Sequence, residues 1–189
     1  MVNSKSSKQV LNRQYRYKYD ILFLHVPALS PEMRGFRSSF NVVAMGLFSM
    51  CTELAKAGFN PQIINLGLQK LLNWNFDIAQ YIKDNKIKIV GISLHWHYHA
   101  YDAITVAKHI KEVNPDIFLF FGGYTSSAFA KDLLKSYSFI DAVIKGEGEK
   151  PVIKIVDQIK NKDNNFSKIE NLCWRYKNKI RCNNKIWFA

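Results

Sequence analysis

The chain has 189 residues, 48% of them hydrophobic, which is enough to bury the core of one globular domain and argues against a disordered chain. Its formal net charge of +12 is carried by the two ends, because residues 1–18 hold five Lys or Arg without an acidic residue and residues 160–189 hold eight against two. The ends lack an aromatic-and-arginine recognition motif. We therefore favour solvated basic ends over contacts with nucleic acid, anionic lipid or an acidic partner domain.

The sequence contains no signal for export or membrane insertion. Its apolar runs fall short of the roughly 20 residues that cross a bilayer, and its polar, basic start lacks the hydrophobic core of a secretory peptide. Three scattered cysteines do not form a disulfide framework. We expect a cytoplasmic protein without a membrane partner.

Apolar periodicity and turn residues predict alternating strands and helices after a loose basic segment at residues 1–18. Strands are predicted at residues 20–26, 61–66, 89–94, 117–121 and 141–144. Helices are predicted at residues 40–57, 75–84, 100–113, 127–137 and around 151–159. A polar linker at 161–167 precedes two short β runs at 171–176 and 179–183.

This alternation predicts an α/β fold with a doubly wound, five-stranded parallel sheet in the flavodoxin-like order 2-1-3-4-5. We assign residues 19–160 to the α/β domain, and residues 161–189 to a linker and a small C-terminal β-hairpin extension. Ligands of open parallel sheets bind at the carboxyl ends of the strands. The expected site therefore lies against the loops after Val26, Leu94 and Phe121.

Several common ligand sites are absent from the sequence. It has neither GxGxxG after the first strand nor GxxxxGK[ST], which argues against the usual dinucleotide and nucleoside-triphosphate sites. The carboxylate cluster of a phospho-receiver domain and the Ser/Thr-rich first loop of a flavodoxin are also missing. What remains at the predicted strand ends is Ser93-Leu94-His95-Trp96 and the turn Gly122-Gly123, where the backbone can approach a ligand closely.

Three segments in order, VGIS, FGGYTSS and IDAVIKGEGE, resemble the cobalamin-binding domain at the N-terminus of radical S-adenosylmethionine enzymes. The serine and Gly-Gly-hydroxyl patterns also resemble the corrinoid domain of methionine synthase. The similarity spans roughly residues 20–176, and the segment ENLCWRYKNKIRCN resembles the hairpin that leads into the radical core of that family. The resemblance implies a Rossmann-like cobalamin-binding fold.

The resemblance also implies a set of cofactor-binding residues. Gly122 and Gly123 would line the channel for the nucleotide tail, Ser93 would bond its buried base or linker, and hydroxyls after Gly123 would meet its phosphate and sugar. An ordinary turn with Ser126 or Ser127 as a helix N-cap is the alternative. The expected residues are Pro27, Ser93, Leu94, His95, Trp96, Gly122, Gly123, Tyr124, Thr125, Ser126, Gly146, Glu147 and Gly148.

The histidines do not provide an expected metal ligand. Methionine synthase-like domains carry Asp-x-His-x-x-Gly after the first strand, but here Phe23 stands two residues before His25, so no protein ligand to cobalt is assigned. His95, His97 and His99 would share one face of an extended segment, as a zinc site requires. No fourth ligand is visible, and we favour residues that line a pocket or an exposed loop.

Two other pairs have alternative interpretations. Glu147 and Glu149 fit acid–base chemistry, but acids before a helix also interact favourably with its dipole. Cys173 and Cys182 would lie opposite each other if Lys177 and Asn178 form a tight turn. A disulfide is then possible, and we favour free thiols because a cytoplasmic location is reducing.

The sequence lacks the CxxxCxxC motif of a radical core. We therefore expect a domain that holds and orients a corrinoid for methyl transfer in a radical S-adenosylmethionine methyltransferase-like enzyme. S-Adenosylmethionine and a four-iron four-sulfur cluster would belong only to a missing downstream domain, in cis or in trans. The alternatives are a stand-alone corrinoid carrier or sensor, and a degenerate flavodoxin-like domain that acts as a protein-interaction module.

Overall fold

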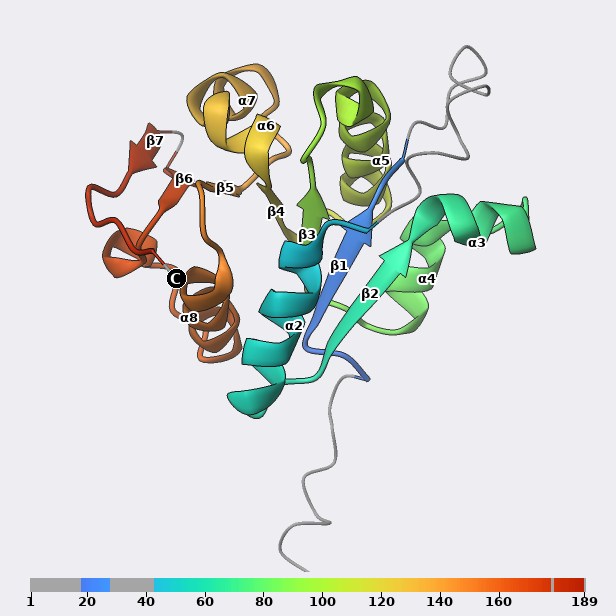
Figure 1. Ribbon diagram of the computed structural model, residues 1–189, viewed down its shortest axis with the longest axis horizontal. Coiled ribbons are helices and arrows are strands. Elements are labelled where there is room, and N and C mark those ends of the chain that lie inside the picture. The colour runs from blue at the N-terminus through green and yellow to red at the C-terminus, as the bar shows by residue number, and fades with distance from the viewer. Residues whose placement is uncertain (1–17, 28–42, 178, 189) are drawn as a thin grey trace, which may run out of the picture.

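A seven-stranded sheet forms the centre of the part of the chain that the structure, a computed structural model, describes: residues 18–27, 43–177 and 179–188 (Figure 1). The strand order is β2-β1-β3-β4-β5-β6-β7, with β1 to β5 parallel, so the predicted order 2-1-3-4-5 is confirmed. The strands are β1 (Ile21–His25), β2 (Pro61–Asn65), β3 (Ile89–Ser93), β4 (Phe118–Gly122), β5 (Ala142–Ile144), β6 (Leu172–Tyr176) and β7 (Lys179–Cys182).

The predicted C-terminal hairpin continues this sheet instead of forming a separate element. Strand β6 pairs antiparallel with β5, and β7 pairs antiparallel with β6. Cys173 and Cys182 are opposite partners and form a disulfide with an S–S distance of 1.99 Å. The prediction of free thiols was therefore wrong. It rested on a reducing compartment and did not consider that the β6–β7 register places the two cysteines opposite each other.

Helices cover both faces of the sheet. They are α2 (Met45–Lys56), α3 (Leu66–Leu72), α4 (Ile78–Asp84), α5 (Ala100–Val113), α6 (Tyr124–Ala128), α7 (Ala130–Ser136) and α8 (Glu149–Lys160). Helices α2 and α8 pack against each other and cover one face, where Phe23, Leu47, Phe120 and Val156 belong to one apolar cluster (Figure 1). A second apolar cluster joins the opposite face to α4, α5 and α7.

Two helices differ from the prediction. Helix α3 was missed because it follows β2 without a loop: Asn65 ends the strand and its side chain accepts a hydrogen bond from the Leu68 N–H at 3.1 Å. The single helix expected at 127–137 begins earlier, at Tyr124, and is interrupted at Phe129, where φ is −109° and ψ is 25°.

The remaining boundaries move by a few residues, and part of the prediction lies outside the described residues. Helix α2 begins at Met45 instead of residue 40, with residues 43–44 not helical and residues 40–42 outside the described range. The basic segment 1–17 and residues 28–39 of the loop after β1 are also outside it. Among the described helices, none is long and apolar enough to cross a lipid bilayer.

Candidate functional site

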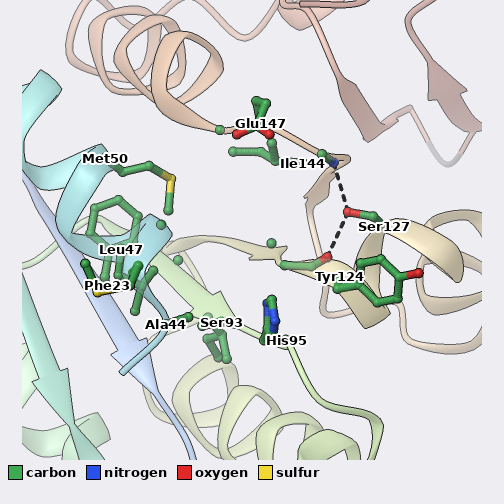
Figure 2. Close-up of a pocket in the computed structure, with 18 of the residues that line it drawn as sticks. Phe23, Ala44, Leu47, Met50, Ser93, His95, Tyr124, Ser127, Ile144 and Glu147 are labelled. Carbon is green, nitrogen blue, oxygen red and sulfur yellow. Dashed lines mark hydrogen bonds between the residues drawn. The ribbon is translucent and has the colours of Figure 1, made fainter. Parts of the chain in front are cut away.

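A pocket of about 1040 Å³ opens at the carboxyl ends of β3, β4 and β5, on the sheet face that α2 and α8 cover (Figure 2). Its walls come from the exit of β3, the β4–α6 turn, the first turns of α2 and the β5–α8 loop. Phe23 of β1 also lines it. Among the residues that the structure describes, aromatic and leucine side chains line this crevice without filling it.

The floor of the pocket depends on the absence of a side chain at Gly91. A Cβ at Gly91 would lie 2.6 Å from Phe120 Cζ and 2.9 Å from Phe23 Cδ1. The two rings meet edge to face there, with centroids 6.4 Å apart and planes at 90°. Gly91 thus lets two aromatic rings form a continuous apolar surface under the pocket.

The alternation of side chains along the strands directs Ser93 and Gly122 to the same side. Ser93 lies on the face of Ile89 and Gly91, and Gly122 lies on the face of Phe120. The two residues are register partners in the β3–β4 ladder. A Cβ at Gly122 would have no heavy atom within 4 Å, whereas the Ser93 side chain is almost fully buried. A buried hydroxyl thus lies beside open space at one end of the pocket.

Gly123 has a different task from Gly122. Its φ is +104°, and a Cβ there would lie 3.0 Å from both the carbonyl carbon and the oxygen of Leu94. The turn into α6 therefore needs both the left-handed backbone and the close approach that glycine allows. Gly123 shapes the turn, while Gly122 leaves space.

The hydroxyls after Gly123 bond to the protein backbone. Thr125 donates to the His95 carbonyl at 2.9 Å, and Ser126 donates to the Gly123 carbonyl at 3.0 Å. Ser127 donates to the same carbonyl at 2.8 Å and accepts from the Gly146 N–H at 2.9 Å, which joins the β4–α6 turn to the β5–α8 loop (Figure 2). The N-cap of α6 is Gly123, so neither serine is the N-cap that the alternative interpretation required.

The β5–α8 loop forms one rim of the pocket and packs against α2. Gly146 has a φ of +69°, and a Cβ at Gly148 would lie 2.8 Å from the Met50 sulfur. Glu149 lies in the first turn of α8, and its carboxylate accepts from the Gly148 N–H at 3.1 Å. Its position fits an interaction with the helix dipole.

The three histidines do not share a face. His95 lines the pocket, whereas residues His97–His99 form a 3₁₀ turn instead of the extended segment that we expected. His99 is buried and its ring lies 5.7 Å from that of His25. Burial, and then the charge of His25, lower the pKa of His99 to about 4. The described residues contain no group of three or more side chains placed to bind a metal ion.

Residues 36–156 match the model of a protein family, the B12 binding domain. The chain belongs to the B12-binding domain family. This result agrees with the resemblance that VGIS, FGGYTSS and GEGE indicated.

Two curated relatives match this chain over a small part of their own, longer chains. Hopanoid C-3 methylase of Methylococcus capsulatus is 27% identical over 121 residues, which cover 64% of this chain and 23% of that protein. An uncharacterized methyltransferase of Pyrococcus horikoshii is 34% identical over 105 residues, which cover 56% of this chain and 22% of that protein. The chain thus spans about a quarter of the length of either relative.

Solved structures show the same fold. The cobalamin-dependent S-adenosylmethionine radical enzyme OxsB, with aqua-cobalamin and S-adenosylmethionine bound, matches with a TM-score of 0.67 and 12% identity. The match covers 89% of this chain and 22% of OxsB. The radical S-adenosylmethionine methyltransferase TsrM from Kitasatospora setae matches with a TM-score of 0.67 and 15% identity, over 85% of this chain and 29% of TsrM. In both structures the shared fold makes up less than a third of a longer chain.

Nine of the residues expected to bind the cofactor line the pocket of this B12-binding domain. They are Ser93, His95, Trp96, Gly122, Gly123, Tyr124, Gly146, Glu147 and Gly148. Leu94 does not line it, because the residue after Ser93 faces the opposite apolar cluster. Thr125 and Ser126 hold the turn behind it, and Pro27 is buried outside its lining.

The first turns of α2, like the aromatic floor, form a part of the B12-binding domain's pocket that the sequence analysis missed. Val43, Ala44, Met45, Gly46, Leu47 and Met50 line it. Met45 is 77% exposed at the start of the helix, and the N-cap Ala44 makes no side-chain hydrogen bond. Helix starts usually carry Ser, Thr, Asp or Asn at the N-cap, so the apolar residues at the start of α2 were the available signal of a different role.

Proposed function

We propose that this pocket binds cobalamin and orients it for methyl transfer in a radical S-adenosylmethionine methyltransferase-like enzyme. The observation that supports this most is the open space at Gly122 beside the buried Ser93, at the end of a pocket of about 1040 Å³. A corrin is a wide, mostly apolar macrocycle with amides at its edge and a nucleotide tail. A large, mostly apolar pocket that ends at space left free by a glycine suits both parts.

Particular residues would hold each part. In this proposal, Ser93 and the backbone of Gly122 and Gly123 receive the tail, and the aromatic floor at Phe23 and Phe120 excludes water. His95, Trp96 and Tyr124 line the mouth, where Trp96 and Tyr124 are 46% and 78% exposed, and would meet the edge of the macrocycle. Bound cobalamin would supply the methyl group that is transferred.

The donor and the radical chemistry would belong to another domain. The solved enzymes with this fold are more than three times as long as the region matched here, and their names include cobalamin or S-adenosylmethionine. We propose a radical S-adenosylmethionine domain, in cis or in trans, as the partner that carries S-adenosylmethionine and a four-iron four-sulfur cluster. This chain's own task is to bind, orient and shield the corrinoid.

A titration with hydroxocobalamin tests the proposal. The purified chain is added to hydroxocobalamin while the visible spectrum is recorded, and the same titration is made with Ser93→Ala. Saturable binding with a shifted spectrum, weakened about fivefold to tenfold by the loss of one buried hydroxyl contact, is expected. Absence of binding at tens of micromolar would reject the proposal and leave the protein-interaction module. If the chain binds hydroxocobalamin but an added radical domain has no effect on methyl transfer, a stand-alone carrier is favoured.

A further inference from the structure

A segment after β7 lies against the α/β domain. Residues 183–188, here called the C-terminal segment, begin at Asn183, whose side-chain amide donates to the carbonyls of Phe166 and Ile169 at 2.7 and 2.8 Å. The Asn183 N–H donates to the Leu172 carbonyl at 2.9 Å. The segment is thus anchored from its first residue.

Asn171 connects this segment to the rim of the pocket. Its buried side-chain amide donates to the Glu147 carbonyl at 3.0 Å and to the Trp187 carbonyl at 2.7 Å, and accepts from the Trp187 N–H at 2.9 Å. Its backbone accepts from the Lys145 N–H at 2.7 Å and donates to the Lys185 carbonyl at 3.0 Å. One residue therefore bonds to the β5–α8 loop on one side and to the C-terminal segment on the other.

The residue type at 171 fits both demands. Its φ is +56°, a left-handed conformation that asparagine adopts more readily than most residues with a side chain. An amide also provides the donors and the acceptor that Glu147 and Trp187 require. An aspartate would keep the acceptor but would place its carboxylate against two carbonyl oxygens.

A neighbouring network of ion pairs also connects the C-terminal segment to the region of the pocket rim. Glu170 is 1% exposed, and its carboxylate lies 2.6 Å from Lys154 Nζ of α8 and 3.0 Å from Lys185 Nζ of the C-terminal segment. Helix α8 begins directly after the rim at Glu149. Residues 170 and 171 thus hold the segment to both the rim and the helix that follows it.

We propose that Asn171 is a positioning residue that couples the C-terminal segment to the pocket rim, so that ligand binding and seating of the segment favour each other. Glu147 lines the pocket, and the same Asn171 amide that donates to the Glu147 carbonyl also bonds to Trp187. Coupling of this kind is reciprocal: whatever the segment adds to ligand affinity, the ligand adds to the seating of the segment. The inference rests on the proposed function only for the identity of the ligand.

The variant Asn171→Gly tests this coupling, since glycine keeps the left-handed backbone and removes only the amide. Asn183→Ala is the matched control, because the Asn183 side chain joins the same segment to Phe166, Ile169 and Trp174, and these hydrogen bonds do not involve the rim. The full 189-residue chain is used, with hydroxocobalamin as the probe. Affinity is measured by visible titration, and amide hydrogen exchange is measured for residues 145–149 and 184–188 with and without the probe.

We expect Asn171→Gly to weaken binding about fivefold to twentyfold, within the usual range of coupling between two sites. Exchange of residues 145–149 should rise without the probe, and the protection of 184–188 that the probe gives the wild type should disappear. Asn183→Ala loosens the segment but leaves the Asn171 link intact, so it should keep the probe-induced protection and lose less affinity than Asn171→Gly. These differences are not expected of a residue that only stabilises the fold.

Other results would overturn the coupling. It is wrong if Asn171→Gly has the affinity and rim exchange of the wild type, or if the probe leaves residues 184–188 of the wild type unprotected. Should Asn171→Gly fail to fold, that second measurement on the wild type decides alone. If the wild type binds no hydroxocobalamin, the proposed function fails, whereas faster rim exchange in Asn171→Gly would still support the linkage and unchanged exchange would refute it.

Discussion

Adjacent glycines at the end of β4 should respond in opposite ways to substitution. Leucine at Gly122 places its Cβ where no heavy atom lies within 4 Å, and the backbone there is not left-handed. The fold should therefore tolerate Gly122→Leu, while its side chain occupies the space that we assign to the nucleotide tail. Alanine at Gly123 meets the Leu94 backbone at 3.0 Å with a φ of +104°, so the fold itself should be strained.

The magnitudes separate the two variants. Filling a fitted site costs about 1–3 kcal/mol, which corresponds to a hydroxocobalamin affinity roughly 5- to 160-fold weaker for Gly122→Leu. A left-handed non-glycine residue costs about 1–3 kcal/mol of stability, with the backbone contact in addition. For a chain of this size, that loss lowers the melting temperature of Gly123→Ala by roughly 2–12 °C.

Thermal melting and visible titration of both variants measure these effects. Ser136→Leu, an exposed substitution outside the pocket lining, controls for added apolar bulk and should match the wild type in both assays. The reasoning is refuted if Gly122→Leu binds hydroxocobalamin as tightly as the wild type. It is equally refuted if Gly122→Leu melts as early as Gly123→Ala, because the open space would then not be open.

Three further substitutions test the floor of the pocket and two buried ionisable groups. Gly91→Ala should reduce the free energy of unfolding by about 1–3 kcal/mol in a urea titration, because its methyl group enters the rings of Phe23 and Phe120; a neutral effect would contradict the packing of the floor. Burial and the charge of His25 lower the pKa of His99 to about 4. The wild type should therefore lose stability as the pH falls from 6.5 towards 4, and His99→Phe should lose less. Equal slopes of melting temperature against pH for the two proteins would contradict this. Burial alone would raise the pKa of Glu170, but hydrogen bonds from Lys154 and Lys185 lower it to about 2. The stability that the Glu170 carboxylate contributes should therefore be present above pH 4.5 and be lost towards pH 2. Glu170→Gln should cost about 1–3 kcal/mol at pH 7 and remove this acid-induced loss, which urea denaturation at pH 7 and at pH 2 measures.

The strand order and the place of the pocket followed from the sequence because they depend on patterns within short segments. Apolar runs such as residues 117–121 can only be strands covered on both faces, and their short connections leave few threadings. The pairing of Ser93 with Gly122 follows from the ends of two neighbouring parallel strands. These features need no knowledge of how the helices sit.

The features that the sequence did not predict depend on tertiary packing. The contribution of Leu47 and Met50 to the pocket is set by how α2 lies across the sheet against α8. The role of Gly91 depends on rings from two neighbouring strands. The directions of the Thr125 and Ser126 hydroxyls depend on which carbonyls the turn brings within reach, and the sequence shows only that hydroxyls are present.

The Ser127 hydroxyl, between the Gly123 carbonyl and the Gly146 N–H, acts as a spacer between two walls of the pocket. One wall follows β4 and the other follows β5, and at this point a single oxygen atom bridges them. The aperture on this side therefore depends on the reach of one short side chain. A family member with a longer or apolar residue there would need a differently shaped mouth to admit the same ligand.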